Sequence, residues 1–289
     1  SPTRSNRKRL GRDSMSRFPT YSLRVRRITR LSPNMKRLVL GGESLDGFPD
    51  DYEGGYIKVL LPRPGVMAVN ERQDDPSTTV RRSFSVRGFD RRAQELTLDF
   101  AEHAAVGPAS RWLEQVGIHD DVRILGPGAV KRLDPTADWA LGVADMAALP
   151  ALAVNLERLP SSTEGHAFIQ VASADDQLEL KHPPGVELHW IVDPAPRRDW
   201  SPLVEAILRH PWRPGRVSIW SATEFHAMKA LRAYFRDERG VPRDTMYISS
   251  YWKLGATDEE HKAAKMAETA APTSKTEPRS NSLGRHAIT

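Results

Sequence analysis

Residues 96–100 read LTLDF and alternate apolar with polar side chains. This period of two is typical of a strand that has one face against a core and the other towards solvent. Similar short segments recur through the first half of the chain, each bounded by Gly, Pro, Asp or Asn. The expected strands are residues 21–30, 35–40, 56–61, 82–87, 95–101 and 121–125. Six such strands fit a small antiparallel barrel, and Pro108 favours a short helix over 108–116 before the last strand.

The sequence pattern changes after about residue 134, where short apolar segments typical of buried strands begin to alternate with segments of helical pattern. An amphipathic stripe of Phe225, Met228, Leu231 and Phe235 indicates one of these helices. Alternating units of this kind predict a parallel sheet with helices on both faces. The expected strands are 139–144, 168–172, 188–192, 217–220 and 246–249, and the other expected helices are 149–158 and 258–268.

These patterns predict a β plus α/β protein of two domains. We expect residues 16–134 to form the barrel domain and residues 135–250 the α/β domain, followed by a C-terminal segment and helix at 251–268. The tails at 1–15 and 269–289 are polar, so we expect them to be disordered.

The composition limits the chemistry that the chain can perform. Its 289 residues include no cysteine, which excludes disulfides, iron–sulfur clusters and thiolate zinc sites. Redox chemistry must therefore use a bound organic cofactor or a metal held by other ligands. The nine histidines include no closely spaced group, so we predict no metal site.

The net charge of +5 lies mainly in the two tails, because residues 16–268 are nearly neutral. A broad basic surface is not indicated, and we expect no specific nucleic-acid partner. No run of eighteen apolar residues is present to span a membrane, and residues 1–15 do not resemble a signal peptide. We therefore expect the protein in the cytoplasm, and we expect it to be a monomer.

The segment RSFS at residues 82–85 carries side chains suited to a flat, anionic ligand. Arg82 and Phe84 share one face of the expected strand, and Ser83 and Ser85 share the other. An arginine suits a pyrophosphate, an aromatic ring lies against a flat heterocycle, and a hydroxyl bonds a ring nitrogen. These are the tasks of a flavin site, although the four residues alone also fit an edge strand with scattered surface charge.

A second segment, GPAS at residues 107–110, stands where a helix should begin. Unpaired N–H groups and the helix dipole at such an end attract phosphate, and small residues allow close approach. His103 could bond the same phosphates. The alternative is a plain helix start with Ser110 exposed.

The order of these motifs resembles the siderophore-interacting protein family of FAD-dependent ferric-siderophore reductases. The resemblance runs from about residue 21 to residue 265. The matching segments are RSFS at 82–85, DFAEH at 99–103, GPASRW at 107–112, GPG at 126–128, ADMAALPA at 144–151, WSATE at 220–224, SYWKLG at 250–255 and DEEHKAAK at 258–265.

The resemblance implies a FAD-binding barrel joined to a nicotinamide-nucleotide-binding α/β domain, as in ferredoxin reductases. It assigns to the FAD site Arg82, Ser83, Phe84, Ser85, Asp99, His103, Gly107, Pro108, Ala109 and Ser110. It assigns to the nicotinamide site Asp145, Ser221, Ala222 and Glu224. Tyr251 and Trp252 either lie near the flavin or are ordinary core aromatics.

The implied activity is electron transfer from NADH or NADPH through FAD to Fe(III) in a siderophore. A flavin accepts a hydride and releases electrons singly, so the chemistry needs no catalytic residue of the protein. Ferric siderophores are often anionic, and the resemblance implies a basic pocket for them. Its candidates are Lys58, Lys131, Arg132 and Lys253, which otherwise are solvated surface cations.

The chain also departs from the family pattern. Phe84 replaces a usual Tyr, Met146-Ala147 replaces Glu-Thr, and Thr223 replaces Gly. The last two changes lie in the nucleotide domain and leave open two alternatives. These are a FAD-loaded siderophore carrier with weak nicotinamide turnover, and a generic flavin reductase with another acceptor. The acidic pair Asp175-Asp176 slightly favours NADH, because a carboxylate repels the 2′-phosphate of NADPH. The alternative is that Arg197 and Arg198 lie nearby and offset this repulsion.

Overall fold

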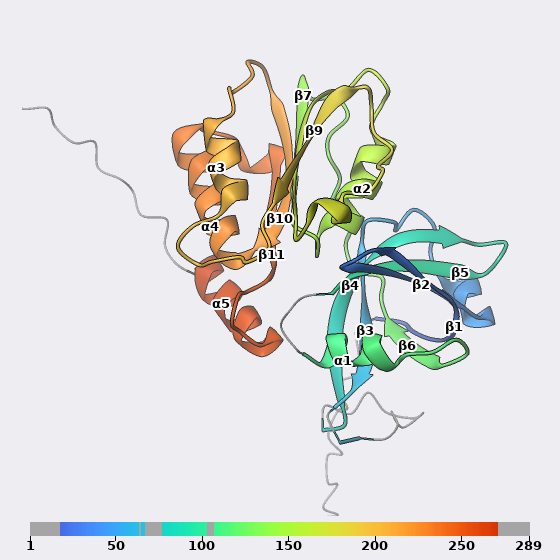
Figure 1. Ribbon diagram of the computed structural model, residues 1–289. Coiled ribbons are helices and arrows are strands. Elements are labelled where there is room, and N and C mark those ends of the chain that lie inside the picture. Colours follow the sequence, from blue (N-terminus) through green and yellow to red (C-terminus); the bar gives the residue numbers. More distant parts are fainter. Residues whose placement is uncertain (1–17, 64, 67–76, 103–106, 271–289) are drawn as a thin grey trace, which may run out of the picture.

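A computed structural model describes residues 18–63, 65–66, 77–102 and 107–270. Figure 1 shows a β-barrel beside a second sheet that is flanked by helices. The barrel is closed in the order β1-β2-β5-β4-β3-β6, and all its pairs are antiparallel. Its strands are β1 (Thr20–Ser32), β2 (Met35–Gly41), β3 (Tyr56–Pro62), β4 (Thr79–Asp90), β5 (Glu95–Ala101) and β6 (Asp121–Leu125). The six-stranded antiparallel barrel predicted from the sequence is confirmed.

Alternate side chains of β5 form part of the barrel core. Leu96, Leu98 and Phe100 are fully buried inside the barrel, since every second side chain of a strand points to the same face. The 3-10 helix η1 (Glu43–Gly47) and the helix α1 (Pro108–Gln115) pack on this core. The start of α1 is thereby fixed to the barrel.

The second sheet is parallel, in the order β11-β10-β7-β8-β9. Helix α2 (Leu149–Arg158) covers one face, whereas α3 (Pro202–Arg209) and α4 (Phe225–Ala233) cover the other. All six residues of the central strand β7 are buried, as expected for a strand that is covered on both faces. The strands are β7 (Trp139–Ala144), β8 (Glu164–Val171), β9 (Gly185–Val192), β10 (Val217–Glu224) and β11 (Met246–Trp252). The predicted α/β architecture is confirmed.

Several elements differ from the sequence expectation. Strands β8 and β9 begin earlier than predicted, because glycine and polar residues interrupt the apolar pattern at their starts. Helix α3 was not predicted, although Ser201 caps it by accepting a hydrogen bond from Val204 N at 3.3 Å and Pro202 follows. The remaining helices are the 3-10 helices η2 (Ala174–Asp176) and η4 (Arg243–Thr245), the π-helix η3 (Tyr234–Glu238) and α5 (Asp258–Ala270).

The expected tails lie largely outside the described residues. Residues 1–17 and 271–289 are not described, whereas Thr269 and Ala270 end α5 and do not belong to a disordered tail. Within the described parts of the chain, no helix combines the length and apolar character needed to cross a bilayer.

A buried carboxylate joins the barrel to the α/β domain. Asp176 in η2 is fully buried and accepts hydrogen bonds from Ser32 Oγ at 2.7 Å, Asn34 N at 2.9 Å and Asn34 Nδ2 at 2.8 Å. Ser173 completes the shell with its hydroxyl and its backbone N–H. Burial raises the pKa of Asp176, but the hydrogen bonds from Asn34, Ser32 and Ser173 outweigh it and hold the pKa below its ordinary value.

We expect Asp176→Ala to lower the free energy of unfolding at pH 7 by about 3 kcal/mol, because it leaves several buried donors without an acceptor. A carboxylate whose pKa is lower in the folded state than in the unfolded state stabilises the fold at pH values above its unfolded pKa of about 3.9. The wild-type advantage should therefore vanish as the pH falls through the folded pKa. Urea unfolding at several pH values measures both effects. Asp175→Ala, on the exposed side of the same turn, is the control, and an equal loss in both variants would contradict the assignment.

Candidate functional site

Arg82 on β4 faces the first turn of α5. Its Nη1 atom lies 3.0 Å from Asp258 Oδ2 and 3.9 Å from Glu259 Oε1, and only 12% of its side chain is exposed. The carboxylate oxygens stand where the oxygens of a phosphate ligand could lie. The guanidinium is therefore held in an orientation that suits an anion.

The rest of the β4 motif divides between the two domains. The Phe84 ring packs on the barrel core, with its centroid 4.3 Å from that of Phe100. Ser85 is buried and is hydrogen-bonded to the hydroxyl of Tyr251 at the end of β11. Burial raises the pKa of Tyr251 well above its ordinary value, so this hydroxyl stays protonated. Ser83 is exposed.

The start of α1 offers backbone N–H groups near β4. Gly107 is the N-cap, Pro108 occupies the first turn, and no side chain caps the helix. Among the described residues, nothing lies within 4 Å of the position that a Cβ at Gly107 would take. Ala109 packs on the barrel core, and Ser110 belongs to the same first turn. His103 lies outside the described residues.

Asp145 follows β7 directly and is buried. Its Oδ2 atom accepts a hydrogen bond from Trp252 Nε1 at 2.7 Å, and its Oδ1 atom accepts from Ala147 N at 3.0 Å and Ala148 N at 3.3 Å. Burial raises the pKa of Asp145 to about 6, although hydrogen bonds from Trp252 and from backbone N–H groups oppose the rise. The carboxyl therefore changes charge close to neutral pH.

The end of β10 carries the other predicted nucleotide residues. Glu224 caps α4 by accepting from His226 N at 2.6 Å, and it also accepts from Leu254 N at 3.0 Å. Ser221 and Ala222 are fully buried. The Ser221 hydroxyl has no hydrogen-bond partner among the described residues, which is rare for a buried polar atom.

A cavity of about 300 Å³ opens where β7, β8, β9 and β10 end. The carboxyl ends of parallel strands are where open α/β sheets bind their ligands. Its lining includes Asp145, Asp193, Arg197, Arg198, Thr223 and His226. Asp145 and Glu224 thus meet at one cavity, whereas Ser221 and Ala222 lie behind it.

The expectation that Asp175-Asp176 selects NADH is not supported. Asp176 turns towards the barrel, where Ser32 and Asn34 surround it. Arg197 and Arg198 line the cavity instead, with the Arg197 guanidinium 4.8 Å from the Trp200 ring centroid. The cavity lining therefore combines two arginines with acidic side chains, among them Asp193 and Glu224, and Asp176 is not part of it.

Asp99 lies on the outer face of the barrel. It accepts two hydrogen bonds from Arg37, at 2.7 Å and 2.8 Å, and its carboxylate lies 3.9 Å from Arg87 Nε. Arg87 also binds Glu157 of α2 at 2.5 Å. These contacts connect the two domains, so the described partners of Asp99 lie on the side of the barrel that faces α2.

Three cations gather between the barrel and α5. Burial, followed by the charges of Lys262 and Arg81, lowers the pKa of Lys58 on β3. Lys58 Nζ also lies 5.5 Å from the Phe18 ring centroid. We call Lys58, Arg81 and Lys262 the basic cluster.

The other predicted substrate residues make different contacts. Lys253 Nζ lies 5.0 Å from the Phe225 ring centroid. The Lys131 carbonyl accepts from Trp220 Nε1 at 3.1 Å, and Arg132 donates to the Asp51 carbonyl at 3.2 Å. No described contact joins these three residues to the basic cluster.

Sequence reasoning missed two residues of the site, Asp258 and Lys262. Asp258 and Lys262 belong to the segment DEEHKAAK, whose four-residue spacing brings both to one side of a helix. That spacing was a usable signal.

The described residues fit a flavin dinucleotide and a nicotinamide nucleotide. An arginine oriented towards anions and the backbone N–H groups at the start of α1 are the groups that a dinucleotide phosphate would engage. Asp145 adds a carboxyl that titrates near neutral pH beside the cavity.

Comparisons with known proteins agree with this geometry. Residues 24–131 match the siderophore-interacting FAD-binding domain, and residues 137–255 match the siderophore-interacting protein family. The chain is 31% identical to the ferric vibriobactin reductase ViuB of Vibrio cholerae, over 80% of this chain and 88% of that protein. It is 26% identical to the NADPH-dependent ferric-chelate reductase of Escherichia coli, over 82% of this chain and 99% of that protein.

Solved structures show the same architecture. The siderophore-interacting protein SipS from Aeromonas hydrophila superposes with a TM-score of 0.78 at 32% identity, covering 88% of this chain and 99% of that one. A ferredoxin-NADP+ reductase from Plasmodium falciparum, at 11% identity and a TM-score of 0.59 over 82% of this chain and 99% of that one, shares the fold. The chain therefore belongs to the siderophore-interacting protein family, with a FAD-binding domain and a ferredoxin-reductase-like fold.

Proposed function

We propose that the chain is a reductase that passes electrons from NADPH or NADH through FAD to Fe(III) held in a siderophore. The observation that carries the proposal is the dipeptide at the end of β11. Tyr251 is bonded to Ser85 of the barrel, and Trp252 donates to Asp145 at the cavity. Consecutive Cα atoms are about 3.8 Å apart. The barrel motif and the nucleotide cavity therefore adjoin, which supports hydride transfer between two bound cofactors.

On the barrel side, the residues present suit FAD. Bound FAD would accept a hydride and release single electrons. Arg82 neutralises a pyrophosphate, and the start of α1 supplies backbone donors to phosphate. The protonated Tyr251 hydroxyl, paired with Ser85, bounds the site on the side of the α/β domain.

On the cavity side, Arg197 and Arg198 favour a nucleotide with an additional phosphate. Both line the cavity, and Arg198 Nη2 donates to the Leu254 carbonyl at 3.2 Å, which fixes its position. We therefore infer a preference for NADPH over NADH. The name of the Escherichia coli relative, which specifies NADPH, supports this inference.

For the iron substrate, the basic cluster is the best candidate. Burial lowers the pKa of Lys58 on β3, and the positive charge of Lys262 on α5 lowers it further. An anionic ferric siderophore between these two lysines would relieve the repulsion of their charges. Two relatives are named as ferric reductases, which supports iron as the acceptor.

The function is tested by anaerobic stopped-flow mixing of the FAD-loaded protein with NADPH. We expect flavin absorbance to bleach, and to return when a ferric siderophore is added with a chelator that traps Fe(II). In Arg197→Ala the KM for NADPH should rise about tenfold, the usual cost of one charge-assisted hydrogen bond. The KM for NADH is the internal control and should not change. Absence of bleaching would favour a siderophore carrier, and reoxidation only by other oxidants would favour a generic flavin reductase.

Arg82→Ala should weaken FAD binding roughly 10- to 100-fold, because it removes one charged partner of the pyrophosphate. Equilibrium dialysis or flavin fluorescence quenching measures the change. Arg24→Ala is the matched control, since Arg24 forms an exposed ion pair with Asp121 on another part of the barrel. Unchanged FAD affinity in Arg82→Ala would remove this residue from the cofactor site.

Lys58→Glu and Lys262→Glu should each raise the KM for an anionic ferric siderophore about tenfold and flatten its dependence on salt. The rate of flavin bleaching by NADPH should not change, because neither residue lines the nucleotide cavity. Lys181→Glu makes the same charge change at an exposed residue between β8 and β9. If it shifted the KM equally, the effect would be one of net charge and not of the basic cluster.

A further inference from the structure

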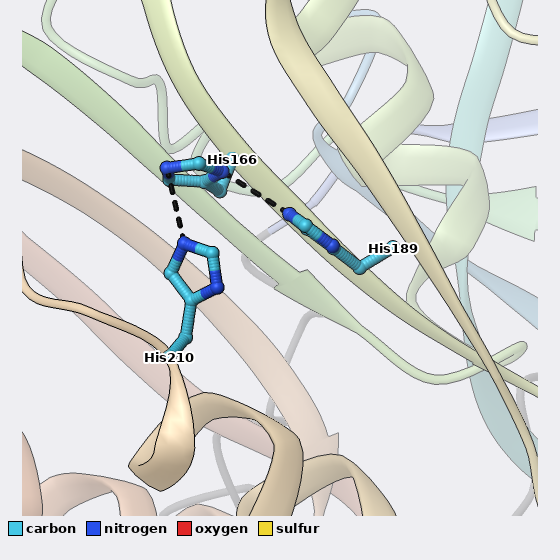
Figure 2. Close-up of side chains that lie close together, drawn as sticks. All are labelled: His166, His189 and His210. Atoms are coloured by element: carbon cyan, nitrogen blue, oxygen red, sulfur yellow. Dashed lines mark hydrogen bonds between the residues drawn. The ribbon is translucent and has the colours of Figure 1, made fainter.

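Three histidines that are distant in the sequence meet on the face of the sheet covered by α3. His166 lies near the start of β8, His189 lies on β9, and His210 directly follows α3. Figure 2 shows the His166 ring between the other two rings. One ring nitrogen from each lies within 4.8 Å of the others. Because these histidines are far apart in the sequence, no spacing motif indicated that they meet.

The cluster is separate from the site described above. The nucleotide cavity opens where the strands end, whereas His166 is the third residue of β8. None of the three histidines lines that cavity. A ligand bound here would be independent of FAD and of the nicotinamide nucleotide.

The closest group within the cluster has two imidazoles and one carboxylate. His166 Nδ1 lies 3.1 Å from His189 Nε2, and Glu187 Oε2 lies 3.6 Å and 3.8 Å from these two atoms. Ligand atoms around a tetrahedral metal with bonds of about 2.0–2.1 Å lie roughly 3.3–3.4 Å apart. The three atoms need only small shifts to surround one ion.

His210 holds the His166 ring from the opposite side. His210 Nε2 lies 3.2 Å from His166 Nε2. A metal-bound histidine usually donates its second N–H to such an acceptor, which fixes the ring and its tautomer. Phe168 stacks on His189 at a centroid distance of 4.4 Å and an angle of 15°, so the second imidazole is also oriented.

The cluster can be reached from solvent through its carboxylate. The Glu187 side chain is 67% exposed, which gives an ion a path from solvent.

We propose that His166, His189 and Glu187 bind a divalent first-row transition-metal ion, with His210 as a positioning residue for His166 and water in the open position. Imidazole with one carboxylate suits both Zn²⁺ and Fe²⁺. The site joins β9, the edge strand of the sheet, to β8 and the end of α3. Bound metal should therefore stabilise this edge.

The test is a titration of the purified FAD-loaded protein, free of any histidine tag, with Zn²⁺ against a colorimetric chelator. A parallel anaerobic arm uses Fe²⁺, for which we expect weaker binding to the same residues. We expect one equivalent to bind and the thermal midpoint to rise. His189→Gln and Glu187→Gln should weaken binding at least about tenfold, since even outer partners of a metal site contribute roughly 10- to 100-fold.

His182→Gln is the matched control, because His182 lies in the same segment but bonds only to the Pro183 carbonyl among its described contacts. Binding of Co²⁺ should give visible ligand-field bands that disappear in His189→Gln and shift in His210→Gln. The exposed Glu187→Gln variant tests the site even if a histidine variant fails to fold. Substoichiometric binding, or equal affinity in Glu187→Gln and His182→Gln, would overturn the proposal.

Discussion

The structure depends on how the barrel is held against the α/β sheet, and Asp176 is central to this contact. Its carboxylate is fully buried and accepts hydrogen bonds from both domains. A buried charge is tolerated only when its partners are in place, so the contact permits few alternative arrangements of the two domains. Two cofactors bound to different domains can exchange a hydride only at contact distance. The domain interface is therefore a requirement of the proposed chemistry.

The end of β11 connects the domain interface to the candidate site. Tyr251, Trp252 and Leu254 contact Ser85, Asp145 and Glu224 in turn. Asp145 becomes an anion near pH 6 because its hydrogen bonds only partly offset its burial. A nicotinamide ring gains positive charge when it loses a hydride. An ionised Asp145 beside the cavity would favour that product. This role would explain why the chain keeps a buried carboxylate whose raised pKa lowers the free energy of unfolding at neutral pH.

Local patterns predicted most of the fold. The alternation in residues 96–100 and the buried run of β7 depend on neighbours within one element, so the sequence contains them. Contacts between distant segments are different. Asn34 and Asp176 are 142 residues apart, and His166 and His210 are 44 apart, so no spacing rule relates them. The acidic pair Asp175-Asp176 is a similar case, because the sequence shows that it follows a strand but does not show that Asp176 faces the barrel.

Helix α5 shows how one short segment can serve both proposed ligand sites. His261 Nε2 lies 2.8 Å from Ser250 Oγ, and Lys265 Nζ donates to Ser249 Oγ at 2.7 Å, so one side of the helix is fixed to β11. Asp258 and Lys262, four residues apart, extend from an adjacent side towards the barrel.

The pair between Asp258 and Arg82 is partly exposed and contributes about 1 kcal/mol or less. Such a pair orients the guanidinium without competing strongly against a doubly charged pyrophosphate, which offers more oxygens and more charge. FAD binding would thus release the Asp258 carboxylate close to Lys262 of the basic cluster. If both proposed sites are correct, the same helix would couple the occupancy of the cofactor site to the charge that an anionic siderophore meets.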